Sequence, residues 1–213
     1  MRLFGVYGAA GCGRGVMPLV RATLPEGTEA VFIDDGDHPD HVNGQRCLTW
    51  QAFLDRPATA RAVCIAIAGG AVRQRLAAHC AVAGVGFFSA RSENVVIMDE
   101  VKIGAGAILS PFVTLTSNIR IGAHFHANIY SYVEHDCIIG DFVTFAPGAK
   151  CNGNVVIGDH AYIGTGAILR QGGPGAPLMI GRGAVVGMGA VVTKDVPPGV
   201  TVVGNPARPF AKE

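Results

Sequence analysis

Several features that mark other classes of protein are scarce in this chain. Charged residues make up 15% of the 213 residues and the formal net charge is +1, so no surface for nucleic acid or for an acidic membrane is indicated. No apolar run reaches the length that a membrane-spanning helix needs, about eighteen residues. Aromatic residues make up only 7%. A nucleic-acid partner and membrane insertion are therefore not expected.

Cysteine pairing and targeting signals are also missing. The 6 cysteines are scattered without a CxxC pair, so neither a disulfide framework nor a zinc site is indicated. Residues 1–6 have the pattern of a β-strand rather than that of a signal peptide. We therefore expect a reduced protein in the cytoplasm.

What the chain does have is a repeat of six residues over its second half. Such a period fits neither an α-helix nor an ordinary strand, and it is typical of a parallel β-helix built from hexapeptides. Glycine often follows the apolar position directly, where we expect it to relieve the turn. The apolar, inward positions are Ile97, Ile103, Leu109, Leu115, Ile121, Ala127, Val133, Ile139, Phe145, Cys151, Ile157, Ile163 and Leu169.

The repeat loses its phase once. The next inward residue after Leu169 is Ile180, which is five residues later than one repeat requires. The excess lies in residues 170–177, a stretch rich in glycine and proline. We expect this loop to be extruded from one corner of the β-helix, either as a tolerated surface loop or as part of the working face.

The first ninety residues follow a different pattern. Glycine turns separate strand and helix patterns, and Thr49 is placed to cap a short additional helix. This order predicts an α/β domain with a small Rossmann-like parallel sheet over residues 1–92, followed by a left-handed parallel β-helix of hexapeptide repeats over residues 93–213. The strand and helix patterns occupy residues 3–7, 16–24, 29–33, 62–67 and 72–82.

Glycines and acidic residues follow the carboxyl ends of these strands, where such sheets bind ligands. The first turn has Gly-x-x-Gly-x-Gly spacing rather than the dinucleotide fingerprint, but it places N–H groups at a helix start, which favours phosphate. An acidic pair after the second strand suits the donor groups of a ribose or a base, although such pairs are often only solvated turns. The expected nucleotide-binding residues are Gly8, Ala9, Ala10, Gly11, Cys12, Gly13, Asp34, Asp35, Gly69 and Gly70.

His135 differs from the other histidines in its surroundings. Three six-residue units close one triangular coil of eighteen residues, with the apolar residues inside the prism so formed. His135 lies two residues after the inward Val133, hence outside the prism at a corner, with acidic residues on both sides. A carboxylate that binds an imidazole fixes its tautomer and raises its basicity. One coil further on stands Gly153, whose N–H is suited to an oxyanion. We interpret His135 with Asp136 as a general base, the alternative being a surface histidine in a turn.

Other reactive residues have simpler explanations. His124 and His126 form an HxH pair, as in metal sites such as those of gamma-type carbonic anhydrases, but no third ligand follows at a suitable spacing. We therefore expect no metal. Cys137 and Cys151 occupy inward positions, so we expect them to fill the core rather than to carry an acetyl group.

Two parts of the chain resemble a known family. Residues 128–140, NIYSYVEHDCIIG, and residues 148–155, GAKCNGNV, follow the small nucleotide-binding domain. Together they resemble the hexapeptide acetyltransferases that N-acetylate nucleotide-linked 4-amino-4,6-dideoxy sugars, close relatives of sialic-acid O-acetyltransferases. The ending GNPAR at residues 204–208 is similar to the tail of hexapeptide transferases in general. The resemblance spans essentially the whole chain.

The resemblance implies an enzyme that uses acetyl-CoA and serves cell-surface glycan synthesis, such as that of O-antigen. It implies a homotrimer with active sites between subunits. His135 would be the general base, Asp136 would tune it, Gly153 would hold the oxyanion and Asn128 would place the reacting groups. The residues implied for acetyl-CoA are Thr144, Gly153, Thr165, Gly187, Met188 and Gly189.

Two departures limit the transfer of sugar specificity. Thr144 stands where some relatives have a second histidine, and Cys12 stands where relatives often have His or Phe. The nucleotide (UDP, GDP or dTDP) and the sugar stereochemistry therefore stay open. The alternative functions are a sugar O-acetyltransferase, a non-catalytic nucleotide-binding trimer and a metal-dependent hydratase.

Overall fold

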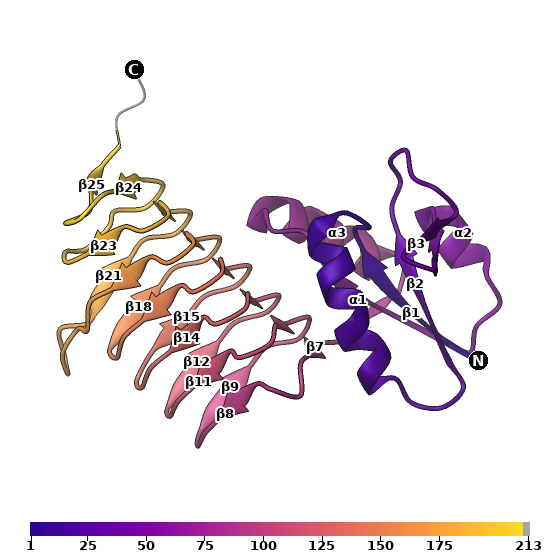
Figure 1. Cartoon of the computed structure of the whole chain (residues 1–213), viewed down its shortest axis with the longest axis horizontal. Helices are drawn as coiled ribbons and strands as arrows, with labels where there is room; N and C mark the ends of the chain where they lie inside the picture. The colour runs from indigo at the N-terminus through magenta and orange to yellow at the C-terminus, as the bar shows by residue number, and fades with distance from the viewer. Residues whose placement is uncertain (211–213) are drawn as a thin grey trace.

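The computed structural model describes residues 1–210 and confirms an α/β domain followed by a parallel β-helix (Figure 1). The helices are α1 (Gly11–Thr23), α2 (Trp50–Asp55) and α3 (Gly70–Val82). The strands of the first sheet are β1 (Arg2–Tyr7), β2 (Thr28–Ile33), β3 (His41–Val42), β4 (Gln45–Leu48), β5 (Ala60–Ile65) and β6 (Gly86–Phe87). The domain boundary after residue 92 stays a prediction, and the end of the predicted second domain, residues 211–213, lies outside the described residues.

The first sheet has the strand order β3-β4-β2-β1-β5-β6. All its pairs are parallel except β3 with β4. The three strands and two main helices expected from the sequence are present, and Thr49 caps α2 by accepting a hydrogen bond from the N–H of Ala52. The β3–β4 hairpin was not predicted. Its turn is Asn43-Gly44, both at positive φ, and this dipeptide is a strong hairpin signal.

The β-helix has three faces. The first comprises β7 (Ala90–Arg91), β10 (Ile108–Leu109), β13 (His126–Ala127), β16 (Thr144–Phe145), β19 (Tyr162–Ile163), β22 (Val185–Val186), β24 (Thr201–Val203) and β25 (Arg208–Pro209). The second comprises β8 (Val96–Ile97), β11 (Thr114–Leu115), β14 (Tyr132–Val133), β17 (Lys150–Cys151), β20 (Ile168–Leu169) and β23 (Val191–Val192). The third comprises β9 (Val101–Ile103), β12 (Ile119–Ile121), β15 (Ile138–Ile139), β18 (Val155–Ile157) and β21 (Leu178–Ile180).

Three corners join these faces, and each is named by the residues that turn there. The first corner, between the first and second faces, contains residues 111–112, 129–130, 147–148, 165–166 and 188–189. The second corner, between the second and third faces, contains residues 117–118, 135–136, 153–154 and 171–172. The third corner, which returns to the first face, contains residues 123–124, 141–142, 159–160 and 182–183.

Register between coils confirms both the repeat and its interruption. His126 pairs with Ile108 before it and with Thr144 after it, each eighteen residues away along the chain. Across the loop, Ile157 pairs with Ile180, so the five extra residues leave the stack undisturbed. The loop therefore projects from the coil without changing which strands lie together.

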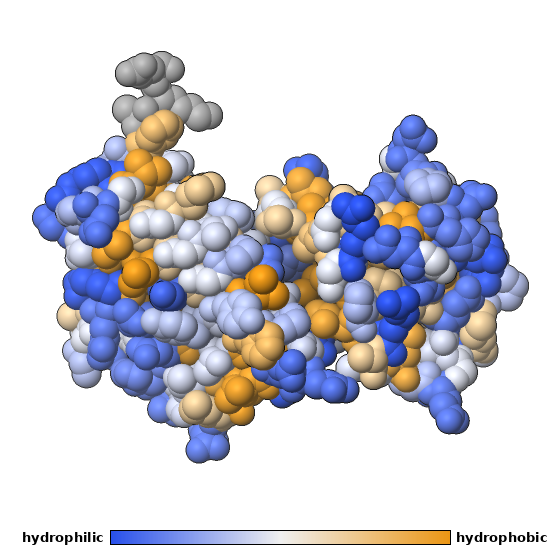
Figure 2. All heavy atoms as spheres, viewed as in Figure 1, coloured by the Kyte–Doolittle hydropathy of each residue, from blue (hydrophilic) through white to orange (hydrophobic). Residues whose placement is uncertain are grey.

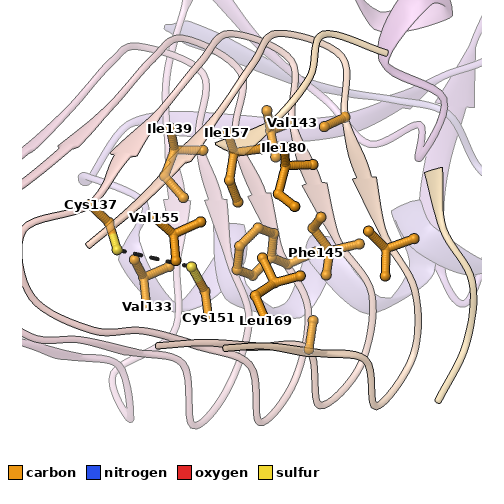
Figure 3. Packing of buried hydrophobic residues seen from close by; sticks show 14 of the residues in the cluster. Val133, Cys137, Ile139, Val143, Phe145, Cys151, Val155, Ile157, Leu169 and Ile180 are labelled. Carbon is orange, nitrogen blue, oxygen red and sulfur yellow. Dashed lines mark hydrogen bonds between the residues drawn. The ribbon is translucent and has the colours of Figure 1, made fainter. Parts of the chain in front are cut away.

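The inward residues form one core inside the prism (Figure 3). From Leu109 to Leu169 every predicted inward position is buried, whereas Ile97 and Ile103 in the first coil are partly buried. Cys137 and Cys151 are both fully buried, with their sulfur atoms 4.0 Å apart. The two thiols are thus core residues, as expected, and neither is accessible to an acetyl donor.

The glycines that follow inward residues have a different role from the expected one. A Cβ at Gly122 or Gly140 would lie 2.7 Å from a backbone nitrogen of the next coil, which no real side chain tolerates. The left-handed backbone occurs two residues later, for example at His124 and Phe142, with φ of 55° and 58°. The expectation that glycine relieves the turn was therefore wrong, because close approach between coils is what excludes a side chain there.

A buried arginine joins the two parts of the chain. Arg73 on α3 is fully buried, and burial lowers its pKa to about 10, so it stays charged at neutral pH. Its guanidinium donates to groups of both parts, which ties the α/β domain to the third corner and the first face. The acceptors are the carbonyl oxygens of Ile67, Ala68, His124, Phe142 and Val143 and the hydroxyl of Thr144.

The surface differs between the two parts in the view of Figure 2. Hydrophobic residues gather in patches on the β-helix, whereas the α/β domain is mostly hydrophilic on this side. Large exposed apolar side chains of the first corner include Phe112, Tyr130 and Met188. Within residues 1–210, no helix combines the length and the hydropathy that a membrane crossing requires.

Replacing Arg73 by Met should lower the free energy of unfolding by roughly 3 kcal/mol or more, because six hydrogen bonds to a charged donor are lost and buried acceptors remain unpaired. The measurement is urea unfolding followed by circular dichroism. Arg75→Met on the exposed side of the same helix is the control. Equal stability of the two variants would contradict the assigned role.

Candidate active site

The glycine turn between β1 and α1 is shaped by two steric requirements. Gly8 has a φ of 107°, and a Cβ at Gly13 would lie 1.8 Å from the carbonyl oxygen of Gly8. Gly11, by contrast, has open space beside it. Because α1 begins without a side-chain cap, the N–H groups of its first turn remain available to an anion.

A cavity of about 280 Å³ lies between this turn and the first face of the β-helix, and we call it the junction cavity. It opens beyond the carboxyl ends of β1 and β5, which are neighbours in the sheet. The strand order reverses between these two strands, and ligands of such sheets bind at that point. The structure thus brings four predicted site residues, Gly11, Cys12, Asn128 and Thr144, to one place. The cavity is lined by Gly11, Cys12, Gly15, Val16, Ala68, Ile108, Ser110, Pro111, His126, Ala127, Asn128, Ile129, Thr144 and Phe145.

A second cavity, of about 470 Å³, lies beside the same turn, and we call it the hairpin cavity. It contains the predicted residues Ala9, Ala10 and Asp34. The N–H of Ala9 donates to Asp34 Oδ2 over 2.9 Å, so the glycine turn and the end of β2 are directly joined. The cavity is lined by Ala9, Ala10, Arg14, Asp34, Asp37, His38, Pro39, His41, Val42 and Asn43.

Some predicted nucleotide residues are engaged within the protein. Asp35 accepts hydrogen bonds from the hydroxyl of Tyr7 (2.8 Å) and the N–H of Trp50 (2.7 Å). Burial, and then the bond to this carboxylate, raises the pKa of Tyr7. A Cβ at Gly70 would lie 2.6 Å from the carbonyl oxygen of Phe142, so Gly70 packs against the β-helix, while Gly69 is exposed. Asp34 is therefore the acidic residue of the pair that lines a cavity.

His135 stands at the second corner as predicted. Its Nδ1 lies 2.8 Å from Asp136 Oδ2, and this hydrogen bond raises the pKa of His135. A Cβ at Gly153 would lie 2.5 Å from His135 Nε2, so the ring covers that glycine and the predicted stacking is confirmed. Within residues 1–210 the N–H of Gly153 donates no hydrogen bond. The His135 ring therefore lies against a glycine whose N–H has no partner there, while the catalytic roles of both residues stay predictions.

The structure does not bring all of the predicted residues together in one chain. Asn128 directly follows β13 of the first face, beside the first corner, whereas His135 turns the second corner. Of the residues predicted for acetyl-CoA, Gly153 lies at the second corner, whereas Thr165 and Gly187–Gly189 lie at or beside the first. There the N–H of Gly189 donates to the carbonyl oxygen of Thr165 over 2.8 Å. Thr144 is separate from them, because its hydroxyl donates to the carbonyl oxygen of Ala68 and accepts from Arg73.

The extruded loop emerges at the second corner. The N–H of Gly172 donates to the carbonyl oxygen of Gly153 over 2.9 Å, one coil beyond His135. A Cβ at Gly172 would lie 2.1 Å from the carbonyl oxygen of Asn154, so glycine is required where the loop begins. Residues 170–177 thus leave the β-helix on the side of the His135 pair.

The sequence did not predict His126, considered above only as part of a metal site, as a residue of a binding cavity, nor Arg14 and Asp37 of the hairpin cavity. His126 lines the junction cavity, is 5% exposed and has no hydrogen-bond partner at Nε2. Burial and then Arg73 hold the pKa of His126 well below its usual value, so the ring is neutral. Its outward position next to the inward Ala127 was the available signal. In the described part of the chain, no three His, Cys, Asp or Glu side chains gather as a metal site.

Comparison with known proteins identifies the family of the chain. No family model matches it. GDP-perosamine N-acetyltransferase from Escherichia coli O157:H7 is 50% identical over 212 residues, which cover 98% of this chain and 96% of that protein. The chain belongs to the hexapeptide-repeat N-acetyltransferases. The resemblance seen in the sequence is thereby confirmed, and so is the class of enzyme, an acetyltransferase.

Solved structures of this N-acetyltransferase family share the whole architecture. WeeI from Acinetobacter baumannii AYE is 58% identical, with a TM-score of 0.95 and coverage of 99% of this chain and 100% of that one. PerB from Caulobacter crescentus, in complex with CoA and GDP-perosamine, is 26% identical, with a TM-score of 0.85 and coverage of 98% and 97%. Both the α/β domain and the β-helix therefore belong to the fold of the family.

Titration should reveal the coupling between His135 and Asp136. Because the carboxylate stabilises the imidazolium, the pKa of His135 should exceed its ordinary value of about 6.5, and Asp136→Asn should lower it. The measurement is the pH dependence of the His135 ring resonances by NMR, with the other histidines as internal controls. An unchanged His135 pKa in the variant would show that the pair does not form in solution.

Proposed function

We propose that this N-acetyltransferase moves the acetyl group of acetyl-CoA to the 4-amino group of GDP-perosamine or a closely similar nucleotide-linked amino sugar. One observation carries the proposal: His135, bound to Asp136, packs against Gly153, whose N–H donates no hydrogen bond within the described residues. The names of similar proteins support the substrate, since they act on or bind GDP-perosamine. The proposal includes a role in cell-surface glycan synthesis and a location in the cytoplasm.

The chemistry follows from the atoms at the second corner. Asp136 holds the proton of His135 on Nδ1, so Nε2 carries the lone pair that accepts a proton from the sugar amine. The amine nitrogen forms a bond to the thioester carbonyl carbon, and the N–H of Gly153 stabilises the oxyanion. When the carbon–sulfur bond breaks, the imidazolium returns its proton to the thiolate, and CoA leaves as a thiol.

The two cavities suggest where the nucleotide sugar binds. In the proposal the diphosphate lies at the start of α1, where uncapped N–H groups favour an anion. The sugar occupies the junction cavity, with its amino group near Asn128 at the first corner. The ribose lies near Asp34 in the hairpin cavity. Acetyl-CoA runs along the first corner past Thr165 and Gly187–Gly189.

Completion of the site requires a second copy of the chain. The junction cavity with Asn128 adjoins the first corner, but His135 and Gly153 occupy the second corner, on the other side of the second face. In a cyclic trimer whose second faces surround the axis, the first corner of one subunit lies beside the second corner of the next. This arrangement also covers exposed apolar residues such as Phe112 and Tyr130. A homotrimer is therefore part of the proposal.

Replacing His135 by Asn should reduce kcat with acetyl-CoA and GDP-perosamine at least ~10²-fold, because a positioned general base contributes about that much. The KM values should change little. CoA release is the measurement, and circular dichroism checks the fold. A loss well below this magnitude in a folded variant would refute the role of His135.

Mixed oligomers test whether sites lie between subunits. His135→Asn removes the base, and Gly11→Phe fills the junction cavity from a position with open space, so each variant alone should be inactive. Co-expression should restore about one quarter of wild-type activity, since one site in four combines an intact cavity with an intact His135 of its neighbour. No recovery in mixed trimers would mean that the site lies within one chain.

A further inference from the structure

The hairpin cavity contains two charged side chains that form no ion pair within the described residues. Arg14 projects from α1 and Asp37 from the segment between β2 and β3, and both line the cavity. The ion pairs found within residues 1–210 are Arg56 with Glu29 and His135 with Asp136, so neither cavity residue has an ionic partner there. An unpaired cation and an unpaired anion at one cavity suit a ligand with both acceptors and donors.

The hairpin cavity also lies where the base of a nucleotide would be. Ala9 and Ala10 line it, while the next residues, Gly11 and Cys12, line the junction cavity. The start of α1 therefore stands between the cavities, and a diphosphate bound there directs its two substituents into different ones. In sheets of this type, an acidic residue at the end of the second strand contacts the ribose, and Asp34 occupies that position.

The segment that carries Asp37 is held in shape from within. His38 Nε2 lies 2.6 Å from the carbonyl oxygen of Asp34, and Nδ1 lies 3.1 Å from that of Pro39. Asp34 Oδ1 accepts the N–H of Gly36 over 3.0 Å. Both nitrogens of His38 are thus engaged by the turn itself. Asp37 is the carboxylate that this ordered turn leaves to a ligand.

We propose that Asp37 and Arg14 read the base of the nucleotide and select guanine. The two oxygens of Asp37 accept the N1–H and the 2-amino group of guanine, while the Arg14 guanidinium donates to O6 and N7. Uracil and thymine present one N–H between two carbonyl oxygens, and adenine presents N1 as an acceptor. Each of these bases therefore binds the carboxylate of Asp37 less favourably than guanine does. The inference rests on the proposed function, because it takes the ligand to be a nucleotide sugar.

Calorimetric titration of the full-length protein with GDP, IDP and UDP tests this assignment, since IDP lacks only the 2-amino group of GDP. The wild type should bind GDP roughly 10- to 100-fold more tightly than IDP, because one hydrogen bond to a charged acceptor is lost. Asp37→Asn should bring the GDP and IDP affinities together and leave that of UDP within about two-fold. Arg14→Gln should weaken GDP and IDP equally, as both carry O6 and N7.

Asp40→Asn is the matched control, since Asp40 is exposed in the same segment but does not line the cavity. It should keep the wild-type order of affinities. A GDP-to-IDP ratio that survives Asp37→Asn, or a ratio of one in the wild type, overturns the inference.

Turnover separates this inference from the proposed acetyl transfer. CoA release with acetyl-CoA and GDP-perosamine is measured on the same preparations. If the wild type turns over but Asp37→Asn leaves the ratio of GDP to IDP affinity unchanged, the proposed recognition of guanine is refuted and the proposed acetyl transfer is not. If GDP binds selectively and this selectivity depends on Asp37, but no CoA is released, the proposed recognition of guanine is supported and the proposed function is refuted.

Discussion

The stacking of equivalent backbone positions from coil to coil is the constraint on which this structure depends. Strands pair eighteen residues apart, so every coil must repeat the same turns at the same places. The close approach excludes side chains at Gly122 and Gly140. The same registry places Gly153 under His135, because the two residues occupy equivalent positions of adjacent coils. The contact between His135 and Gly153 is thus a consequence of the stack.

Arg73 supplies the second constraint, since it joins a domain without repeats to the side of the β-helix. A buried guanidinium is tolerated only where acceptors surround it, and here they come from both parts of the chain. The contact fixes α3 against the third corner and binds Ala68 and Thr144, which both line the junction cavity. It also engages the hydroxyl of Thr144, which explains why that residue lies apart from the others expected near acetyl-CoA.

The division of the site between two corners connects the fold to the assembly. Asn128 and the glycine turn adjoin one cavity, and His135 with Gly153 forms a separate pair. In a single chain, the proposed amino-sugar site and the general base His135 lie on different sides of the β-helix. The proposed reaction therefore requires a trimer. The loop at residues 170–177 leaves the stack on the His135 side, where a neighbouring subunit and CoA would meet it.

The sequence alone determined the features that depend on short-range periodicity: the inward core, the corner position of His135, its stacking on Gly153 and the extruded loop. These were predictable because each coil repeats its own local pattern. Only the tertiary structure decided that Arg73 is buried, that Thr144 supports the domain contact, and that Asp35 orders Tyr7 and Trp50. Those roles depend on how a non-repeating domain docks, through contacts between residues far apart in the chain, and no local pattern encodes them.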